Sequence, residues 1–219
     1  MAIAFDAHTT FKETTGTSLT FSHTCTGSNL VLWVNVLIQS GTDLVTGVTY
    51  NGVAMTRAGT PAVQGTQTDY GYYLYNPATG SNSVVVSTSS SVQIDAHSTS
   101  FTGVDSGHTP AYNTGGGASG TQLSVSVTTT VDNSWLVGGS RNNFGPTSGG
   151  TNTTWRETAT SFGMSDSNGA LSPAGSYSQT WIWGTNAANL GWVADIAPPV
   201  AATVSAVSTG SLLLMGVGN

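Results

Sequence analysis

Alternating polar and apolar positions define the first patterned segment of the chain. In residues 18–25, which read SLTFSHTC, the residues Leu, Phe, His and Cys share one face and Ser and Thr share the other. This alternation predicts a β-strand with one buried face. After a Gly-Ser-Asn turn, residues 30–38 read LVLWVNVLI. Such a short apolar run predicts a strand that is buried on both faces.

A hairpin signal comes next in residues 48–56, which read VTYNGVAMT. The central dipeptide, Asn51-Gly52, is flanked by β-branched and apolar residues. A two-residue type I′ turn requires positive φ at both central positions, and Asn and Gly both tolerate it. We therefore expect two antiparallel strands that are joined at this dipeptide.

Further strand patterns recur at short intervals, and no window combines helical periodicity with capping residues. Additional strands are predicted over residues 70–75, 83–88 and 92–102, with turns at 76–80 and 103–107. Many short strands separated by Gly, Asn, Ser and Pro are typical of a β-sandwich. Residues 113–120, NTGGGASG, are predicted to form a flexible connector.

The second half of the sequence weakly repeats the first. Residues 17–34 align without a gap on residues 121–138, and residues 83–103 are echoed by 177–197. In the first alignment the matched pairs are Leu19 with Leu123, Phe21 with Val125, Asn29 with Asn133 and Leu32 with Leu136.

This repeat leads to a specific prediction of the fold and domains. We expect an all-β protein, a two-sheet antiparallel β-sandwich that is jelly-roll-like and is built from two weakly repeated halves. The sandwich domain spans residues 1–197, with halves at about 1–112 and 118–197, and residues 198–219 form a separate tail. Two independent domains joined by the Gly-rich connector are the alternative.

Composition excludes several classes of function. Only 6% of the 219 residues are charged, the net charge is −6, and there are four Lys and Arg residues in all. A basic patch for nucleic acid or for an anionic membrane surface cannot be built from so few cations. The 6 Trp, 7 Tyr and 6 Phe argue against disorder. A single cysteine, Cys25, rules out an intrachain disulfide.

Catalytic chemistry has little support in the sequence. His23 and Cys25 share one strand face, which would suit a Cys–His or metal pair, but their place after Leu19 and Phe21 favours a buried structural role. Asp95 is expected to face solvent, and Asp195 has a similar place in the second half, so a glycosidase pair is the one acid–base alternative. We predict no catalytic, cofactor-binding or metal-binding residue and no enzymatic activity.

Aromatic residues offer the remaining candidate for binding. Trp181 and Trp183 share a face with Ile182 opposite, and we expect this Trp pair to fill the core. An exposed tip near Tyr70 and Tyr72 is the better candidate for stacking on a cell-surface glycan. Calcium is a further alternative because loop oxygens are abundant, although no D-x-D-x-D-G run is present.

Four segments in fixed order carry a family resemblance: SHTCTGSNLVLWVNV, VTYNGVAMT, YLYNPATGSNSVVV and SFTGVD. This set resembles a β-sandwich module common in phage virion structural proteins and in bacterial surface proteins. The resemblance covers about residues 3–197. It implies a β-sandwich with a structural or adhesive role that is not enzymatic, and it carries over no catalytic residue.

From this resemblance we expect a phage virion structural protein, either a capsid decoration protein or a head-fibre subunit that binds and stabilises the particle surface. The alternatives are a tail-fibre or receptor-binding module and an extracellular carbohydrate-binding module. Expected partners are the major capsid protein or another virion protein, and copies of the chain in a homo-oligomer such as a trimer. The N-terminal sequence shows no Sec-type signal pattern, so we expect synthesis in the host cytoplasm and release within particles.

The C-terminal tail is predicted to be an assembly element. Pro198 and Pro199 end the last strand, because proline cannot continue a ladder. The segment after them has no charged side chain and would expose its apolar residues to water. We expect an interface with a sister subunit or a capsid protein, formed by Leu212, Leu213, Leu214, Met215 and Val217. The alternative is that the tail packs back onto its own sandwich.

Overall fold

Sixteen β-strands make up the regular structure in the residues that the computed structural model describes, which are 1–157 and 161–200. These ranges contain no helix. The N-terminal half carries β1 (Ala4–Cys25), β2 (Val31–Ile38), β3 (Val45–Tyr50), β4 (Val53–Ala54), β5 (Thr56–Arg57), β6 (Ala62–Gln64), β7 (Gln67–Tyr75) and β8 (Gly80–Thr102). The C-terminal half carries β9 (Tyr112–Gly117), β10 (Gln122–Thr128), β11 (Trp135–Asn142), β12 (Pro146–Gly149), β13 (Thr154–Trp155), β14 (Phe162–Asp166), β15 (Ser176–Trp183) and β16 (Asn189–Ile196). The predicted all-β, antiparallel character is confirmed.

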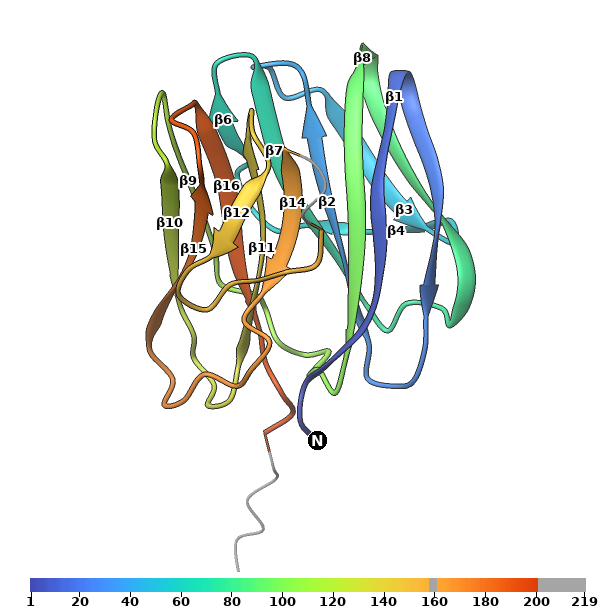
Figure 1. Ribbon diagram of the computed structural model, residues 1–219. Coiled ribbons are helices and arrows are strands. Elements are labelled where there is room, and N and C mark those ends of the chain that lie inside the picture. The colour runs from blue at the N-terminus through green and yellow to red at the C-terminus, as the bar shows by residue number, and fades with distance from the viewer. Residues whose placement is uncertain (158–160, 201–219) are drawn as a thin grey trace, which may run out of the picture.

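The strands of the N-terminal half form one hydrogen-bonded sheet that folds over itself. Its order is β4-β3-β8-β2-β7-β5, with β1 beside β8 and β6 beside β7. The C-terminal part of β8 pairs with β2, whereas its N-terminal part pairs with β3. Side chains of β2 and β3 nevertheless pack in one core, so the sheet must bend between these two parts. Figure 1 shows β1 and β8 turning over together at the pole opposite the N-terminus.

The core inside the N-terminal half follows the predicted alternation. Leu19, Phe21, His23 and Cys25 are all buried, as their shared face requires. Leu19, Phe21 and Cys25 pack against apolar side chains of β2, β3 and β8, which on β2 are Leu32, Val34, Val36 and Ile38. All eight residues of β2 are buried, so the prediction of a strand covered on both faces is confirmed.

The C-terminal half contains two sheets with a core between them. A five-stranded sheet has the order β13-β14-β11-β16-β9, and a three-stranded sheet has the order β10-β15-β12. Trp181 and Trp183 of β15 are almost fully buried in this core beside Leu136 and Val193. The prediction that this Trp pair fills the interior is therefore confirmed.

A third core joins the two halves. Trp33 of β2 stacks on Trp192 of β16 with ring centroids 5.3 Å apart, and Phe101, Trp135 and Met164 pack around them. The molecule is thus a stack of sheet layers in which β2 and β7 lie centrally (Figure 1). The described residues form three hydrogen-bonded sheets, so the expected count of two was wrong. Local alternation identifies the buried faces of a strand but does not reveal which layer covers each face.

The Asn51-Gly52 hairpin is confirmed in its details. Tyr50 pairs with Val53, which leaves these two residues as the turn. Their φ angles are 49° and 76°, both positive as a type I′ turn requires. The hairpin joins β3 to the short β4 at an edge of the eight-stranded sheet.

The predicted flexible connector at residues 113–120 is wrong over most of its length. Tyr112–Gly117 forms β9, which pairs with β16. The glycines serve close packing here: a Cβ on Gly115 would lie 2.8 Å from Val125 Cγ2, and a Cβ on Gly116 would lie 2.8 Å from the Asn189 carbonyl oxygen. Glycine in a strand often marks such a close approach, which composition alone does not distinguish from flexibility.

Candidate functional site

The expected glycan contact at Tyr70 and Tyr72 is not supported by their positions. Tyr70 is 0% exposed and Tyr72 is 4% exposed, so the exposed tip that we predicted is wrong. The Tyr70 hydroxyl donates to Asp43 Oδ1 at 3.0 Å, and the Arg57 guanidinium lies over its ring. Both rings belong to the core of the N-terminal half, so neither offers a free face to a sugar.

The two carboxylates considered for acid–base work are buried. Asp95 was expected to face solvent but is 4% exposed, and its Oδ1 accepts a hydrogen bond from Gln93 Nε2 at 3.1 Å. Burial raises the pKa of Asp95. Asp195 is completely buried, and its Oδ1 accepts the Ala111 N–H at 2.7 Å. Polar positions in these strands face inward because another sheet layer covers them.

His23 is the centre of a buried hydrogen-bond network. Its Nδ1 lies 2.9 Å from the hydroxyl oxygens of Thr9 and Ser98, and its Nε2 lies 3.0 Å from Ser100 Oγ. The Ser100 hydroxyl donates to Asp6 Oδ2 at 2.6 Å. In a nucleophilic triad the hydroxyl proton points to the histidine. Here it points to the carboxylate instead, and burial lowers the pKa of His23 to about 4.

Cys25 ends the same strand and is fully buried, as predicted from its face. Burial raises the pKa of its thiol, which disfavours the reactive thiolate form. The structural interpretation of the His23–Cys25 pair therefore has direct support from its surroundings.

A group of chemically competent side chains that the sequence analysis did not select lies between the halves. His8 of β1, His97 of β8 and Glu157 each offer a ligand atom, and these atoms lie within 4.8 Å of one another. His97 is completely buried, and Glu157 is 9% exposed. Glu157 follows β13, far along the chain, so no local spacing could have indicated this group.

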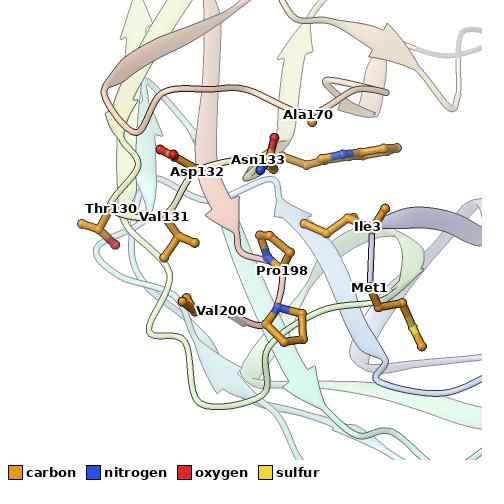
Figure 2. Close-up of a pocket in the computed structure, with 12 residues that line it drawn as sticks. Met1, Ile3, Thr130, Val131, Asp132, Asn133, Ala170, Pro198 and Val200 are labelled. Carbon is orange, nitrogen blue, oxygen red and sulfur yellow. The ribbon is translucent and has the colours of Figure 1, made fainter. Parts of the chain in front are cut away.

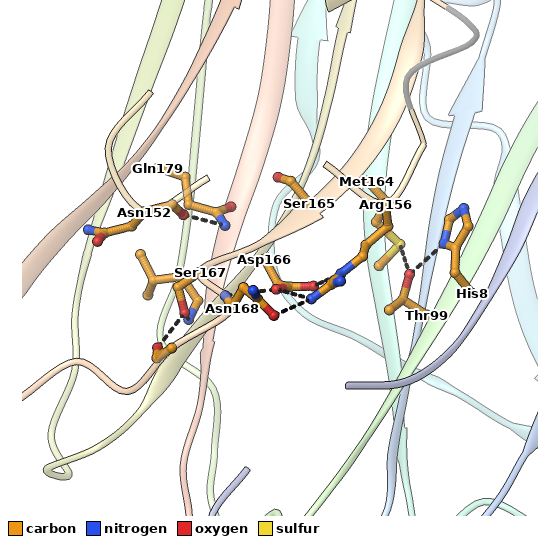
Figure 3. A network of polar contacts seen from close by, with 12 residues as sticks. His8, Thr99, Asn152, Arg156, Met164, Ser165, Asp166, Ser167, Asn168 and Gln179 are labelled. Carbon is orange, nitrogen blue, oxygen red and sulfur yellow. Dashed lines mark hydrogen bonds and ion pairs between the residues drawn. The ribbon is translucent and has the colours of Figure 1, made fainter. Parts of the chain in front are cut away.

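Two residues beside the group hold it in place. Figure 3 shows Thr99 between His8 Nδ1 and the Met164 sulfur, at 2.9 and 3.2 Å. Arg156, which precedes Glu157, makes a two-point contact with the buried Asp166 of β14, with Nη2 2.7 Å from Oδ1. Its backbone N–H also donates to the Met164 carbonyl at 2.9 Å. These contacts fix the His8 ring and the chain immediately before Glu157.

A pocket of about 850 Å³ lies at one pole of the molecule. We call this end the terminal pole, defined by Met1, Ile3, Val131, Pro198 and Val200, which surround the pocket in Figure 2. The buried Trp135 contributes to its wall.

At the terminal pole, the backbone before the two prolines is held by a hydrogen bond, and apolar side chains are exposed beside it. The Ala197 carbonyl accepts the Asp105 N–H at 2.8 Å, which holds the chain immediately before the two prolines. Met1 and Val200 are 75% and 69% exposed, although both side chains are apolar. Exposed apolar groups that gather at one site are typical of an interaction surface.

The predicted assembly residues Leu212, Leu213, Leu214, Met215 and Val217 lie outside the described residues. Among the residues that the structure describes, no helix is long and apolar enough to cross a membrane.

No family model, curated protein or solved structure matches the sequence. The resemblance to the phage and bacterial surface module therefore rests on the four ordered segments. The terminal pole and the layered body are the structural features that bear on function.

Proposed function

We propose that the protein is a phage virion structural subunit, a capsid decoration or head-fibre protein that binds and stabilises the particle surface. The observation that carries this proposal is the terminal pole. Both ends of the described chain meet there, beside a pocket with apolar side chains, and the uncharged apolar segment of the sequence begins at the same place. A capsid decoration protein needs one end that attaches to the particle, here the terminal pole, and an opposite end that faces the solvent.

The body above this pole is suited to a mechanical role. Apolar cores pack the sheet layers against one another, and antiparallel ladders join the strands within each of the three sheets. Four Trp side chains, Trp33, Trp181, Trp183 and Trp192, are among its largest fully buried groups. Large buried aromatic areas and interlocked layers favour a stiff domain that keeps its shape under load.

We also propose that the body consists of two related, jelly-roll-like halves. Parts of β1 and β8 run beside β2 and β7 in the first half, and β9 and β16 run beside β11 and β14 in the second. The other ends of β1 and β8 adjoin β3, as β10 and β15 adjoin β12. The aligned residues Asn29 and Asn133 both have positive φ, at 51° and 63°. The matching pairing order and turns support a repeat.

The proposed partners are the major capsid protein or another virion protein, together with copies of the chain in a homo-oligomer. A partner that binds against the terminal pole would bury the exposed side chains of Met1 and Val200. This burial would lower the free energy by about 25 cal/mol for each Å² of apolar surface removed from water.

Truncation after Ala197 tests the proposal. The last strand ends at Ile196, so the shortened chain keeps every described strand. We expect a folded β-protein that no longer co-purifies with particles, whereas the full chain does so at a fixed copy number measured by quantitative mass spectrometry. The matched control removes only Gly218 and Asn219 and should bind particles normally.

Three outcomes would contradict the proposal. Normal particle binding by the truncated chain would exclude attachment through this end. Absence of the full chain from purified particles would exclude a virion role. Specific binding of the full chain to a glycan array, without particle binding, would favour the carbohydrate-binding alternative.

A further inference from the structure

We propose that His8, His97 and Glu157 form a binding site for a divalent transition metal ion, Zn²⁺, that connects the two halves of the molecule. His8 and His97 come from adjacent strands of the N-terminal half, β1 and β8. Glu157 comes from the C-terminal half, two residues after the end of β13. The proposal concerns the interior of the body and does not depend on the proposed virion role.

The first argument is the state of the His97 ring. It is completely buried, and neither ring nitrogen has a hydrogen-bond partner. Burying a polar group without a hydrogen bond costs free energy, because the group loses its contacts with water. The ring packs on Phe162 with centroids 4.3 Å apart, which accounts for its apolar faces but leaves both nitrogens unsatisfied. A bound cation would satisfy one of them.

The second argument is the orientation of His8. The Thr99 hydroxyl donates to the Met164 sulfur at 3.2 Å, so its oxygen is left to accept the Nδ1–H of His8 at 2.9 Å. This places the lone pair of His8 on Nε2, which is buried and has no hydrogen-bond partner. An outer hydrogen bond to one ring nitrogen that directs the other nitrogen to a metal is the usual arrangement at histidine ligands.

The third argument is the carboxylate opposite this lone pair. His8 Nε2 lies 3.9 Å from Glu157 Oε2. Two electron-rich atoms that face each other at this distance in a buried site favour a cation between them. The neighbouring Arg156 does not fill that place, because its guanidinium is directed to Asp166.

The distances are compatible with a bound ion after small side-chain rotations. Zinc–nitrogen bonds of about 2.0–2.1 Å in a tetrahedral site place ligand atoms about 3.3 Å apart. The present separations, up to 4.8 Å, require each ligand atom to move inward by roughly an ångström or less. The Phe11 N–H donates to Glu157 Oε2 at 3.2 Å and helps to orient the carboxylate.

The ligand set identifies the class of metal. Two imidazoles and one carboxylate suit zinc and other first-row divalent ions, whereas Ca²⁺ and Mg²⁺ prefer oxygen ligands alone. Three protein ligands leave a fourth position for water. The predicted absence of a metal-binding residue is therefore the expectation that this proposal would replace.

Metal titration of the full chain tests the proposal. After treatment with EDTA and its removal, we expect isothermal titration with ZnCl₂ to give one site for each chain. At a free Zn²⁺ concentration 100 times the Kd, Tm should rise by about 5–10 °C. CoCl₂ should give the intense visible absorption of a four-coordinate site, and ZnCl₂ should abolish it.

Two conservative variants locate the ligands. His8→Gln and Glu157→Gln should each weaken Zn²⁺ binding by at least about 100-fold, more than outer-shell changes usually do. Both variants keep a polar side chain of similar size, and circular dichroism confirms that they fold. His108→Gln is the matched control, because His108 Nε2 contacts Asp195 Oδ1 at 2.9 Å and His108 is not one of the proposed ligands. The Zn²⁺ affinity of this variant should equal that of the wild type.

Each remaining outcome would overturn the proposal. No Zn²⁺ binding by the full chain would exclude the site and leave His97 as a core packing residue. Unchanged affinity in the two variants would assign the binding to another place on the surface. A weak, six-coordinate cobalt spectrum that is the same in the wild type and in both variants would exclude coordination by this group.

Discussion

The core inside the N-terminal half and the core between the halves are built on opposite principles. Inside the N-terminal half, polar groups that enter the core are satisfied: the Tyr50 hydroxyl donates to the Ala78 carbonyl at 3.1 Å, and both nitrogens of His23 have partners. Between the halves, Trp33 Nε1 and both oxygens of Asp69 are buried without a hydrogen-bond partner.

This difference shows that the junction of the halves is where buried polar atoms most often lack hydrogen-bond partners. Unsatisfied buried polar atoms cost free energy, and native proteins contain only a few of them. In the described chain many lie at or near the junction of the halves, and they include the hydroxyls of Tyr75 and Tyr112. The aromatic stack at this junction must therefore provide much of the stability that keeps the halves together.

Removing the centre of that stack is the most disruptive test. Trp192 stacks on Trp33 and Tyr112, and its Nε1 donates to Asn35 Oδ1 at 2.8 Å. We expect Trp192→Ala to lower the free energy of unfolding by about 3–5 kcal/mol, because it leaves a large cavity and an unpaired amide. Urea unfolding followed by circular dichroism measures this loss.

The comparison requires a matched change inside a half. Val34→Ala removes buried volume from the core of the N-terminal half without touching the junction. If unfolding of Trp192→Ala stays a single transition of unchanged midpoint, the junction contributes less than we infer. Two separate transitions in Trp192→Ala alone would show that the halves unfold independently once the stack is lost.

A smaller change tests how tightly the halves approach. A Cβ on Gly139 of β11 would lie 2.2 Å from Asn35 Nδ2. We expect Gly139→Ala to cost about 1–3 kcal/mol through overpacking. Gly47→Ala, where a Cβ meets no atom within 4 Å and φ is not positive, should change stability by less than about 0.5 kcal/mol. Equal effects in the two variants would contradict a close junction at β11.

The last test concerns the buried carboxyl of Asp69. Burial raises its pKa well above the ordinary carboxyl value, so the folded protein holds a proton that the unfolded chain releases. Stability from this group is present at low pH and falls as pH rises above the ordinary carboxyl range, by up to about 1.4 kcal/mol per pH unit. Asp69→Asn is neutral at every pH and should flatten this decline.

Denaturation at a series of pH values from about 4 to 7, across the range in which the raised pKa acts, measures the difference between the wild type and Asp69→Asn. Asp43→Asn is the control, since Asp43 is exposed and pairs with Arg57. A decline that is equally steep in Asp69→Asn would show that Asp69 is ionised in the fold.

The sequence predicted the features that depend on one strand or one turn. The face shared by Leu19 and Phe21, the doubly buried β2, the Asn51-Gly52 hairpin and the Trp181–Trp183 pair all follow from local pattern and turn chemistry. The C-terminal boundary at the two prolines also agrees with the end of β16 at Ile196.

The features that the sequence could not predict depend on how layers stack. Tyr70 and Asp95 suit a surface by their polar context in the chain, yet a neighbouring layer covers both. Gly115 suits a flexible connector by composition, because only the packed structure shows Val125 against it. His8, His97 and Glu157 meet through the junction of the halves, which no spacing in the chain records.

The fold-over of β1 and β8 has a consequence for the height of the molecule. β1 starts at the terminal pole and reaches the opposite end near Gly16 before it turns back (Figure 1). At about 3.3 Å per residue, this span is roughly 40 Å. Ser89 and Ser90, at the matching turn of β8, are exposed at that far end. A peptide inserted between them would be carried about 40 Å away from whatever holds the chain ends, as cargo on a display scaffold of fixed length.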